Sequence, residues 1–248
     1  MPLWVEAGLW GLAGGGALVV GALVAWFVKV PRDVVAVVMA FGAGVLIAAA
    51  SFELVDEAEK TGGLLATSAG FLGGAVVYVL ANVALARRGA RHRKRSSNQP
   101  TESEQAGSGT AIAVGALLDG VPESVVLGVS LLSGGGVGVA MLAAVVISNV
   151  PEGLSSVAGM KQAGRGARYV FGVWGGIAVV SGLSAAVGTL LLDGASPQLV
   201  AVITAVAAGA ILAMVADTMI PEAFDRAHLY TGLCTTAGFL TAFVVERL

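Results

Sequence analysis

The sequence predicts an all-α membrane protein with eight transmembrane helices, and three observations support that prediction. The 248 residues are 56% hydrophobic and only 12% charged, whereas soluble domains carry about 25% charged residues. Long apolar segments recur along the chain and contain many of its 36 glycines, as is usual where membrane helices pack closely. Basic residues are confined almost entirely to alternate connections between these segments.

Each apolar segment is long enough to cross a bilayer, which takes about 20 residues in a helix. The expected helices span residues 7–28, 34–55, 63–86, 109–132, 136–160, 169–192, 198–220 and 230–246. Residues 1–248 are expected to form a single polytopic membrane domain. The chain has one cysteine, Cys234, which excludes an internal disulfide.

The basic residues predict how the chain is oriented. Four connections on one side of an eight-span chain hold all but two of the 14 Lys and Arg residues, the exceptions being Lys60 and Arg247. By the positive-inside rule, these connections are cytoplasmic and both termini are extracytoplasmic. We therefore expect a multi-pass protein of the plasma membrane, with the lipid bilayer as its surroundings.

Residues 87–107 form the only extended polar stretch, RRGARHRKRSSNQPTESEQAG. Its composition is typical of a basic, disordered cytoplasmic loop that helps to set the topology. Contact with anionic lipids is an alternative role for such a loop. A regulatory metal contact would have to depend on His92 alone.

An internal repeat relates the two ends of the chain. Residues 44–48 resemble 209–213, residues 56–58 resemble 221–223, and residues 69–72 resemble 237–240. In the expected topology the second and seventh helices run in opposite directions, so the repeat is inverted. Helices 1–3 and 6–8 would then enclose helices 4 and 5, an arrangement found in secondary transporters with a midplane site.

Two similar motifs lie in the middle of the fourth and fifth apolar segments. They are Asp119-Gly120-Val121-Pro122-Glu123 and Ser148-Asn149-Val150-Pro151-Glu152. A proline inside a helix removes a backbone donor and releases the carbonyl four residues earlier. We therefore expect helices 4 and 5 to be broken at these points, with the carbonyls of Leu118 and Ile147 available as oxygen ligands.

Acidic residues within the expected spans are the candidates for a cation site, since charges inside a membrane are costly and usually functional. Asp119 and Glu123 are spaced i, i+4 and share one helix face. Ser148 and Glu152 have the same spacing, and Asn149 lies three residues before Glu152. A short connection makes the two helices neighbours, so facing Glu123 and Glu152 side chains would suit a divalent cation.

These residues resemble a known family. The paired motifs are similar to the His-Asn-x-Pro-Glu-Gly motifs on helices 4 and 5 of ZIP (Zrt-, Irt-like) metal transporters. Residues 208–222 also resemble that family's Gly-rich run ending in Glu-x-x-Pro-Glu, and the bacterial branch looks most similar. The resemblance implies a binuclear metal site between helices 4 and 5, bridged by Glu123 and Glu152, with Asn149 as the motif asparagine. It also implies movement of metal into the cytoplasm.

Several positions depart from the family pattern. Asp119 and Ser148 replace the motif histidines, Gly120 and Ser124 replace an asparagine and a glycine, and residues 181–186 lack the acid and proline often found on helix 6. The candidate ligands are therefore nearly all oxygen atoms. The family implies zinc or iron as cargo, whereas oxygen ligands suit Mn²⁺, Mg²⁺ or Ca²⁺. The site is expected to hold a transported ion of the zinc, iron or manganese class and no resident cofactor.

Glu53 and Asp217, toward the ends of their spans, could mark the entrance and exit of the cation path or simply reach interfacial water. A Na⁺- or H⁺-coupled carrier of a small solute is the main alternative function. A metal sensor and an intramembrane aspartyl hydrolase using Asp119 and Asp217 are further alternatives. The sequence indicates a transporter that is not an enzyme and does not bind nucleic acid; a homodimer is one compatible assembly.

Overall fold

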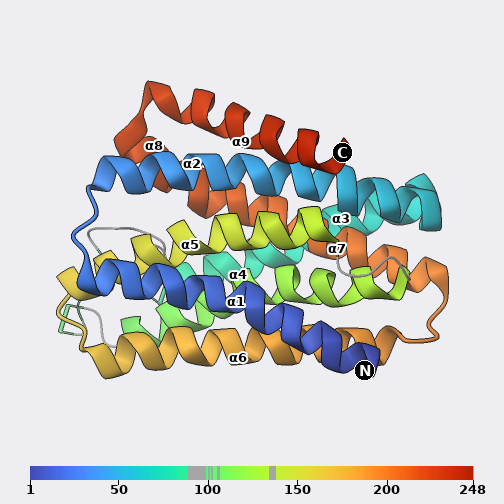
Figure 1. Cartoon of the computed structure of the whole chain (residues 1–248), viewed down its shortest axis with the longest axis horizontal. Helices are drawn as coiled ribbons and strands as arrows, with labels where there is room; N and C mark the ends of the chain where they lie inside the picture. Colours follow the sequence, from blue (N-terminus) through green and yellow to red (C-terminus); the bar gives the residue numbers. More distant parts are fainter. Residues whose placement is uncertain (89–98, 100, 102, 105–106, 134–137, 248) are drawn as a thin grey trace.

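The part of the chain that the structure describes is helical and contains no strand. The computed structural model describes residues 1–88, 99, 101, 103–104, 107–133 and 138–247. The α-helices are α1 (Leu3–Phe27), α2 (Arg32–Ala49), α3 (Asp56–Ala86), α4 (Ser108–Ser130), α5 (Val139–Gln162), α6 (Ala167–Leu192), α7 (Pro197–Met214), α8 (Ile220–Ala227) and α9 (Leu229–Arg247). Figure 1 shows these helices lying roughly side by side along one axis. The expected all-α class is confirmed.

Two π-helical segments connect helices without a loop. The segment η1 (Ala50–Val55) links α2 to α3, and η4 (Val215–Met219) links α7 to α8. A short 3-10 turn, η3 (Leu131–Ser133), follows α4. π-Helical segments disturb the regular hydrogen-bond ladder and are frequent at functional sites. η4 begins 165 residues after η1, and Gly209 follows Gly44 by the same interval.

Six helices in the described ranges are long and apolar enough to cross a membrane. They are α1, the continuous run 32–86, α4, α5, α6 and the run 197–227, while α9 contributes a shorter apolar stretch, Leu229–Val245. This is the construction expected of a multi-pass membrane protein. It differs from the sequence-based expectation because no loop separates residues 34–55 from residues 63–86: two helices follow one another directly within this run.

That run is kinked at Gly63, whose backbone leaves the helical region with φ 77° and ψ 164°. A side chain would be strained in this conformation, and glycine adopts it readily because it has no Cβ. The expected start of a helix at residue 63 therefore coincides with a kink.

Helix starts follow local chemistry. Pro2 and Pro31 directly precede α1 and α2, and Pro197 is the first residue of α7, where its missing N–H is not needed by the helix. Ser196 caps α7, because its side chain accepts a hydrogen bond from the Leu199 N–H at 3.3 Å.

Replacing Ser196 with alanine is expected to reduce stability, toward the lower part of a range of about 0.5–2 kcal/mol. The Leu199 N–H loses its side-chain acceptor and keeps only the backbone carbonyl of residue 196, at 3.0 Å. Thermal unfolding of the purified protein measures the change. Ser68→Ala, on the exposed face of α3, is the control. An equal effect of the two substitutions would show that the cap contributes nothing.

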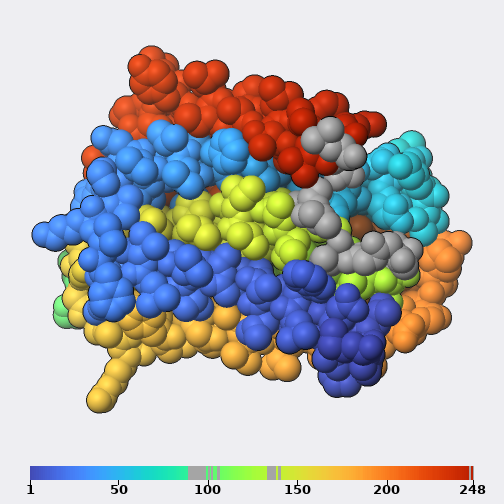
Figure 2. All heavy atoms as spheres, viewed as in Figure 1, coloured from blue at the N-terminus to red at the C-terminus, as the bar shows by residue number. Residues whose placement is uncertain are grey.

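The helices pack as two groups. In the first group, α1 packs against α5 and α6, and α4 packs against α6. In the second group, α3 packs against α7, and α2 packs against α9 and α8. The two groups meet mainly where α2 contacts α5 and where α4 contacts α7 and α3. Figure 2 shows α5 reaching the surface as a strip between α1 and α2.

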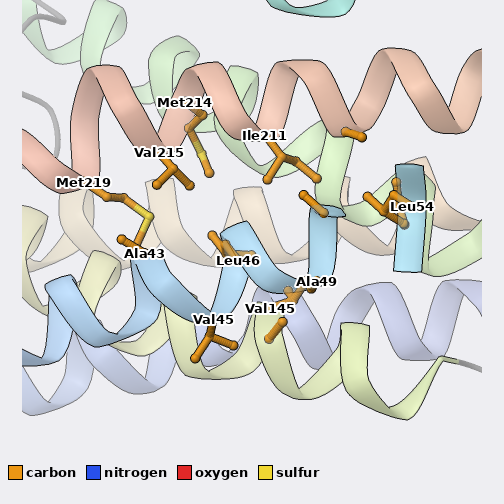
Figure 3. Packing of buried hydrophobic residues seen from close by; sticks show 14 of the residues in the cluster. Ala43, Val45, Leu46, Ala49, Leu54, Val145, Ile211, Met214, Val215 and Met219 are labelled. Carbon is orange, nitrogen blue, oxygen red and sulfur yellow. The ribbon is translucent and has the colours of Figure 1, made fainter. Parts of the chain in front are cut away.

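A buried apolar cluster fills the space where the groups meet. Figure 3 shows Leu46 of α2, Ile211 and Met214 of α7 and Val145 of α5 within this cluster. The methionines suit such a junction because their flexible side chains fill irregular gaps. The candidate acidic side chains of α4 and α5 therefore lie in helices that flank an apolar core.

Several helices expose large apolar side chains on the outside of the molecule. Leu65 of α3, Leu191 of α6 and Leu233 of α9 are among them. Extended exposed apolar surface is unusual in soluble monomers and marks contact with a membrane or a partner. These faces fit the hydrocarbon region of a bilayer.

Basic side chains gather at one end of the bundle. The Lys161 ammonium donates to the Trp26 carbonyl at 2.7 Å, Arg32 donates to Gln162 at 3.3 Å, and Arg165 donates to Ser108 at 2.8 Å. Figure 1 places both chain termini at the opposite end. This separation of basic connections from the termini agrees with the charge pattern of the sequence.

The expected disordered loop, 87–107, lies mostly outside the described residues. One of its described members is Gln99, which is buried and donates from Nε2 to the Ser156 carbonyl of α5 at 3.0 Å.

Candidate metal centre

Two of the candidate ligands, Asp119 and Glu123, lie one turn apart on α4. Both side chains are only 2% exposed. They are buried because α4 packs against α6, α1 and α7 on different sides. A carboxylate removed from water needs a hydrogen-bond donor, a proton or a cation to offset the loss of hydration.

The expectation that helices 4 and 5 are broken is wrong. Both α4 and α5 continue through Pro122 and Pro151. Each proline removes only one backbone donor, and neighbouring helices and hydroxyl side chains make proline tolerable in membrane helices. The carbonyls of Leu118 and Ile147 thus lie within continuous helix.

Asp119 is connected to the second helix group by a hydrogen bond. The Tyr78 hydroxyl of α3 donates to Asp119 Oδ1 at 2.7 Å, the usual distance for an O–H···O bond. Tyr78 is 1% exposed and belongs to the apolar cluster at the junction of the groups. Tyr78 could not be predicted from the sequence, because no sequence pattern shows that this residue of α3 lies beside Asp119 of α4.

Three further candidates lie on α5 and are buried: Ser148, Asn149 and Glu152. The Asn149 Nδ2 group donates to the Gly14 carbonyl of α1 at 3.0 Å, and the Ser148 hydroxyl donates to the Val145 carbonyl at 3.0 Å. Both side chains retain oxygen lone pairs that can bind a cation.

α1 fixes the position of this part of α5 by close backbone contact. A Cβ atom at Gly21 would collide with the Val150 carbonyl, and one at Gly153 would collide with the Leu18 carbonyl. Small residues permit such approach between membrane helices. Pro151 and Glu152, which lie between Val150 and Gly153, are therefore held against α1.

α6 contributes a hydroxyl at the level of the α4 motif. A Cβ atom at Gly120 would lie 3.7 Å from Ser181 Oγ, and Ser181 is buried. The helix 6 segment that lacks the family acid therefore adjoins the motif of α4. It adds another weakly polar oxygen and no charge.

The two pathway candidates, Glu53 and Asp217, lie in the two π-helical segments, η1 and η4. Glu53 is half-buried, and its carboxylate lies against Gly138 beside the start of α5. Asp217 is exposed and accepts a hydrogen bond from Asn82 Nδ2 at 3.1 Å. The two acids therefore have different surroundings, and their exposure agrees with access to water.

Glu222 is a buried acid that lies beyond the end of the helix expected over residues 198–220. It is 5% exposed on α8 and accepts a hydrogen bond from Ser155 of α5 at 3.2 Å. Glu222 follows Pro221, just as Glu123 follows Pro122 and Glu152 follows Pro151. This third Pro-Glu pair was the signal that could have identified it.

No group of three or more His, Cys, Asp or Glu side chains in the described ranges is gathered closely enough to hold a metal ion. Asp119, Ser148 and Asn149 are instead engaged by protein groups. For these residues to bind a cation, the oxygen atoms on α4 and α5 would have to move closer together. The assignment of these five side chains as metal ligands stays a prediction.

Basic residues are absent from the interior of the described part, since none of its Lys and Arg side chains is buried. The two histidines do not contribute there either: His228 is exposed at the junction of α8 and α9, and His92 lies outside the described residues. The chemistry available around α4 and α5 is therefore that of carboxylate, amide and hydroxyl oxygens.

Comparison with models of known families and with curated proteins gives no match to this chain.

Proposed function

We propose that the protein is a ZIP-type transporter that moves a divalent metal cation across a membrane, into the cytoplasm. The observation that carries the proposal is the burial of Asp119, Glu123 and Glu152 on two helices of an apolar bundle, at 2%, 2% and 3% exposure. Three buried carboxylates inside an apolar bundle favour a site that accepts positive charge. Their positions in the paired Pro-Glu motifs support the resemblance to ZIP proteins.

The cargo is proposed to be an ion of the zinc, iron or manganese class. Glu123 and Glu152 would be the principal ligands, with Asp119, Ser148 and Asn149 completing the shell. This set contains only oxygen donors, which favour Mn²⁺ over Zn²⁺, since zinc sites usually include imidazole or thiolate.

The proposed architecture has eight spans, in which the first three and the last three form an inverted repeat around α4 and α5. These six spans are the expected helices 1–3 and 6–8, the last of which corresponds to α9. The kink at Gly63 and the apolar length of α9 support the eight-span layout. Two features support the repeat. The π-helical segments occur at matching positions. Gly44 and Gly209 both lie directly against the backbone of a neighbouring helix, at the Thr235 carbonyl of α9 and the Phe71 carbonyl of α3 respectively.

In the proposed orientation, the basic connections face the cytoplasm and both termini lie outside a plasma membrane. Glu53 and Asp217 would border the path on either side of the site. Movement of α4 and α5 relative to the repeated helices would expose the cation to each side in turn. Such movement requires the hydrogen bonds between the helix groups to break or rearrange.

Metal flux into proteoliposomes tests the proposal. We expect the wild-type protein to admit at least one of Mn²⁺, Fe²⁺, Zn²⁺, Co²⁺ and Cd²⁺, and we expect Glu123→Gln/Glu152→Gln to abolish that flux, because the cation loses both negative ligands. Glu57→Gln, on an exposed surface, controls for the removal of a glutamate. Equal flux through the wild type and the double variant would rule out these ligands.

The same assay distinguishes the proposed metal transport from the main alternative function. A Na⁺- or H⁺-coupled carrier of a small solute would give no flux of any divalent ion, even though the protein is folded. A metal sensor would bind an ion without flux.

A further inference from the structure

A hydrogen bond connects Tyr78 of α3 to Asp119 of α4. Tyr78 is almost completely buried among apolar side chains, and its hydroxyl donates to Asp119 Oδ1 at 2.7 Å. A buried tyrosine hydroxyl generally has a polar partner. Here that partner is a candidate cation ligand, although the apolar cluster would have accommodated a phenylalanine.

The bond joins the two helix groups. Tyr78 is on α3, which packs mainly against α7, while Asp119 is on α4, which packs mainly against α6. The carboxylate therefore takes its position from a helix outside its own group. Rotation of the Asp119 side chain about its two torsions is restricted by a donor that comes from α3.

We propose that Tyr78 is a positioning residue that orients the Asp119 carboxylate for the cation. This inference rests on the proposed function. Carboxylate ligands are commonly fixed by hydrogen bonds from neighbouring groups, and removing such a neighbour typically lowers metal affinity 10- to 100-fold. A carboxylate oxygen has two lone pairs, so it can accept the Tyr78 proton and still bind a cation.

Orientation matters here because the neighbouring ligands are flexible oxygen donors. Glu123 lies one turn from Asp119 on the same helix and has one more side-chain torsion. Without Tyr78, Asp119 would lose one of the contacts that order it, more of its ordering would have to occur when the cation binds, and part of the affinity would be lost. Tyr78 would thus act on affinity without touching the ion.

Thermal stability as a function of Mn²⁺ concentration tests the proposal on the full-length purified protein. Tyr78→Phe is expected to raise the apparent Kd for Mn²⁺ by about 10- to 100-fold. Tyr169→Phe is the matched control, because it removes a hydroxyl that donates to the Gly109 carbonyl at 2.6 Å, away from the motif, and it should leave the Kd unchanged.

A double-mutant cycle distinguishes positioning from a general effect on packing. In an Asp119→Ala background, adding Tyr78→Phe should change the Kd no further, since the carboxylate to be oriented is gone. Additive losses would overturn the assignment. Equal Kd values for the wild type and Tyr78→Phe would overturn the role of Tyr78 but leave the proposed function intact. A wild type that does not respond to any divalent ion would overturn the proposed function as well.

Transport in membrane vesicles supplies a second readout if Tyr78→Phe is too unstable to purify. Positioning predicts a raised KM for Mn²⁺ with a smaller change in kcat. A lower apparent kcat at an unchanged KM would indicate fewer folded molecules and would overturn the positioning role.

Discussion

Replacing Gly209 with leucine is expected to prevent the protein from assembling its second helix group. A Cβ atom at this position of α7 would collide with the Phe71 carbonyl of α3, and a backbone atom cannot move aside as the end of a side chain can. Overpacking costs about 1–3 kcal/mol even where side chains can adjust. We therefore expect a loss of at least about 3 kcal/mol, which lowers the Tm by roughly 6 °C or more for a chain of this size.

The yield and thermal stability of the purified variant measure this effect. Gly73→Leu on α3 is the control, because a Cβ atom there meets nothing within 4 Å. Gly44→Leu, which would collide with the Thr235 carbonyl of α9, should be as damaging as Gly209→Leu. Normal stability of Gly209→Leu would contradict the close packing of α3 and α7.

Introducing histidine at both Asp119 and Ser148 is expected to shift metal preference toward Zn²⁺. The double variant Asp119→His/Ser148→His supplies two imidazole donors to a site that otherwise offers oxygen atoms, and imidazole suits zinc better than manganese. We expect the ratio of Zn²⁺ to Mn²⁺ affinity to rise at least roughly tenfold, which corresponds to about 1.4 kcal/mol.

Competition between the two ions in the flux assay measures this preference. Ser68→His, which adds an imidazole to an exposed position of α3, controls for non-specific zinc binding. If the double variant kept the wild-type preference, positions 119 and 148 would not contact the transported ion.

The helices were largely predictable because the length of each apolar segment and the positions of the basic residues are visible in the local sequence. The proline motifs were not, since Pro122 and Pro151 leave α4 and α5 continuous. Propensity rules describe an isolated helix, whereas a membrane helix packed among neighbours, as α4 is against α6 and α5 against α1, tolerates the loss of one backbone hydrogen bond at a proline. The continuity of η1 with α3 was also missed, because π-helical segments have no clear sequence pattern.

For the candidate site, only the arrangement of residues within each helix could be predicted. Helical spacing brought Asp119 and Glu123 onto one face, and both are buried as expected. Partners from distant helices could not be inferred, because Tyr78 and Gly14 contact the motifs only through tertiary packing. Glu222 was missed because the expected helix ended at residue 220, whereas the chain continues as helix to Ala227.

Equilibrium dialysis of the purified protein against Mn²⁺ tests the central claim most directly. We expect the wild type to bind at least one ion per chain, and at a free concentration of 100 Kd this binding should stabilise the fold by about 2.7 kcal/mol. Glu123→Gln/Glu152→Gln should bind none at that concentration while remaining folded. Equal binding by the two proteins would contradict the claim that Glu123 and Glu152 hold the cation.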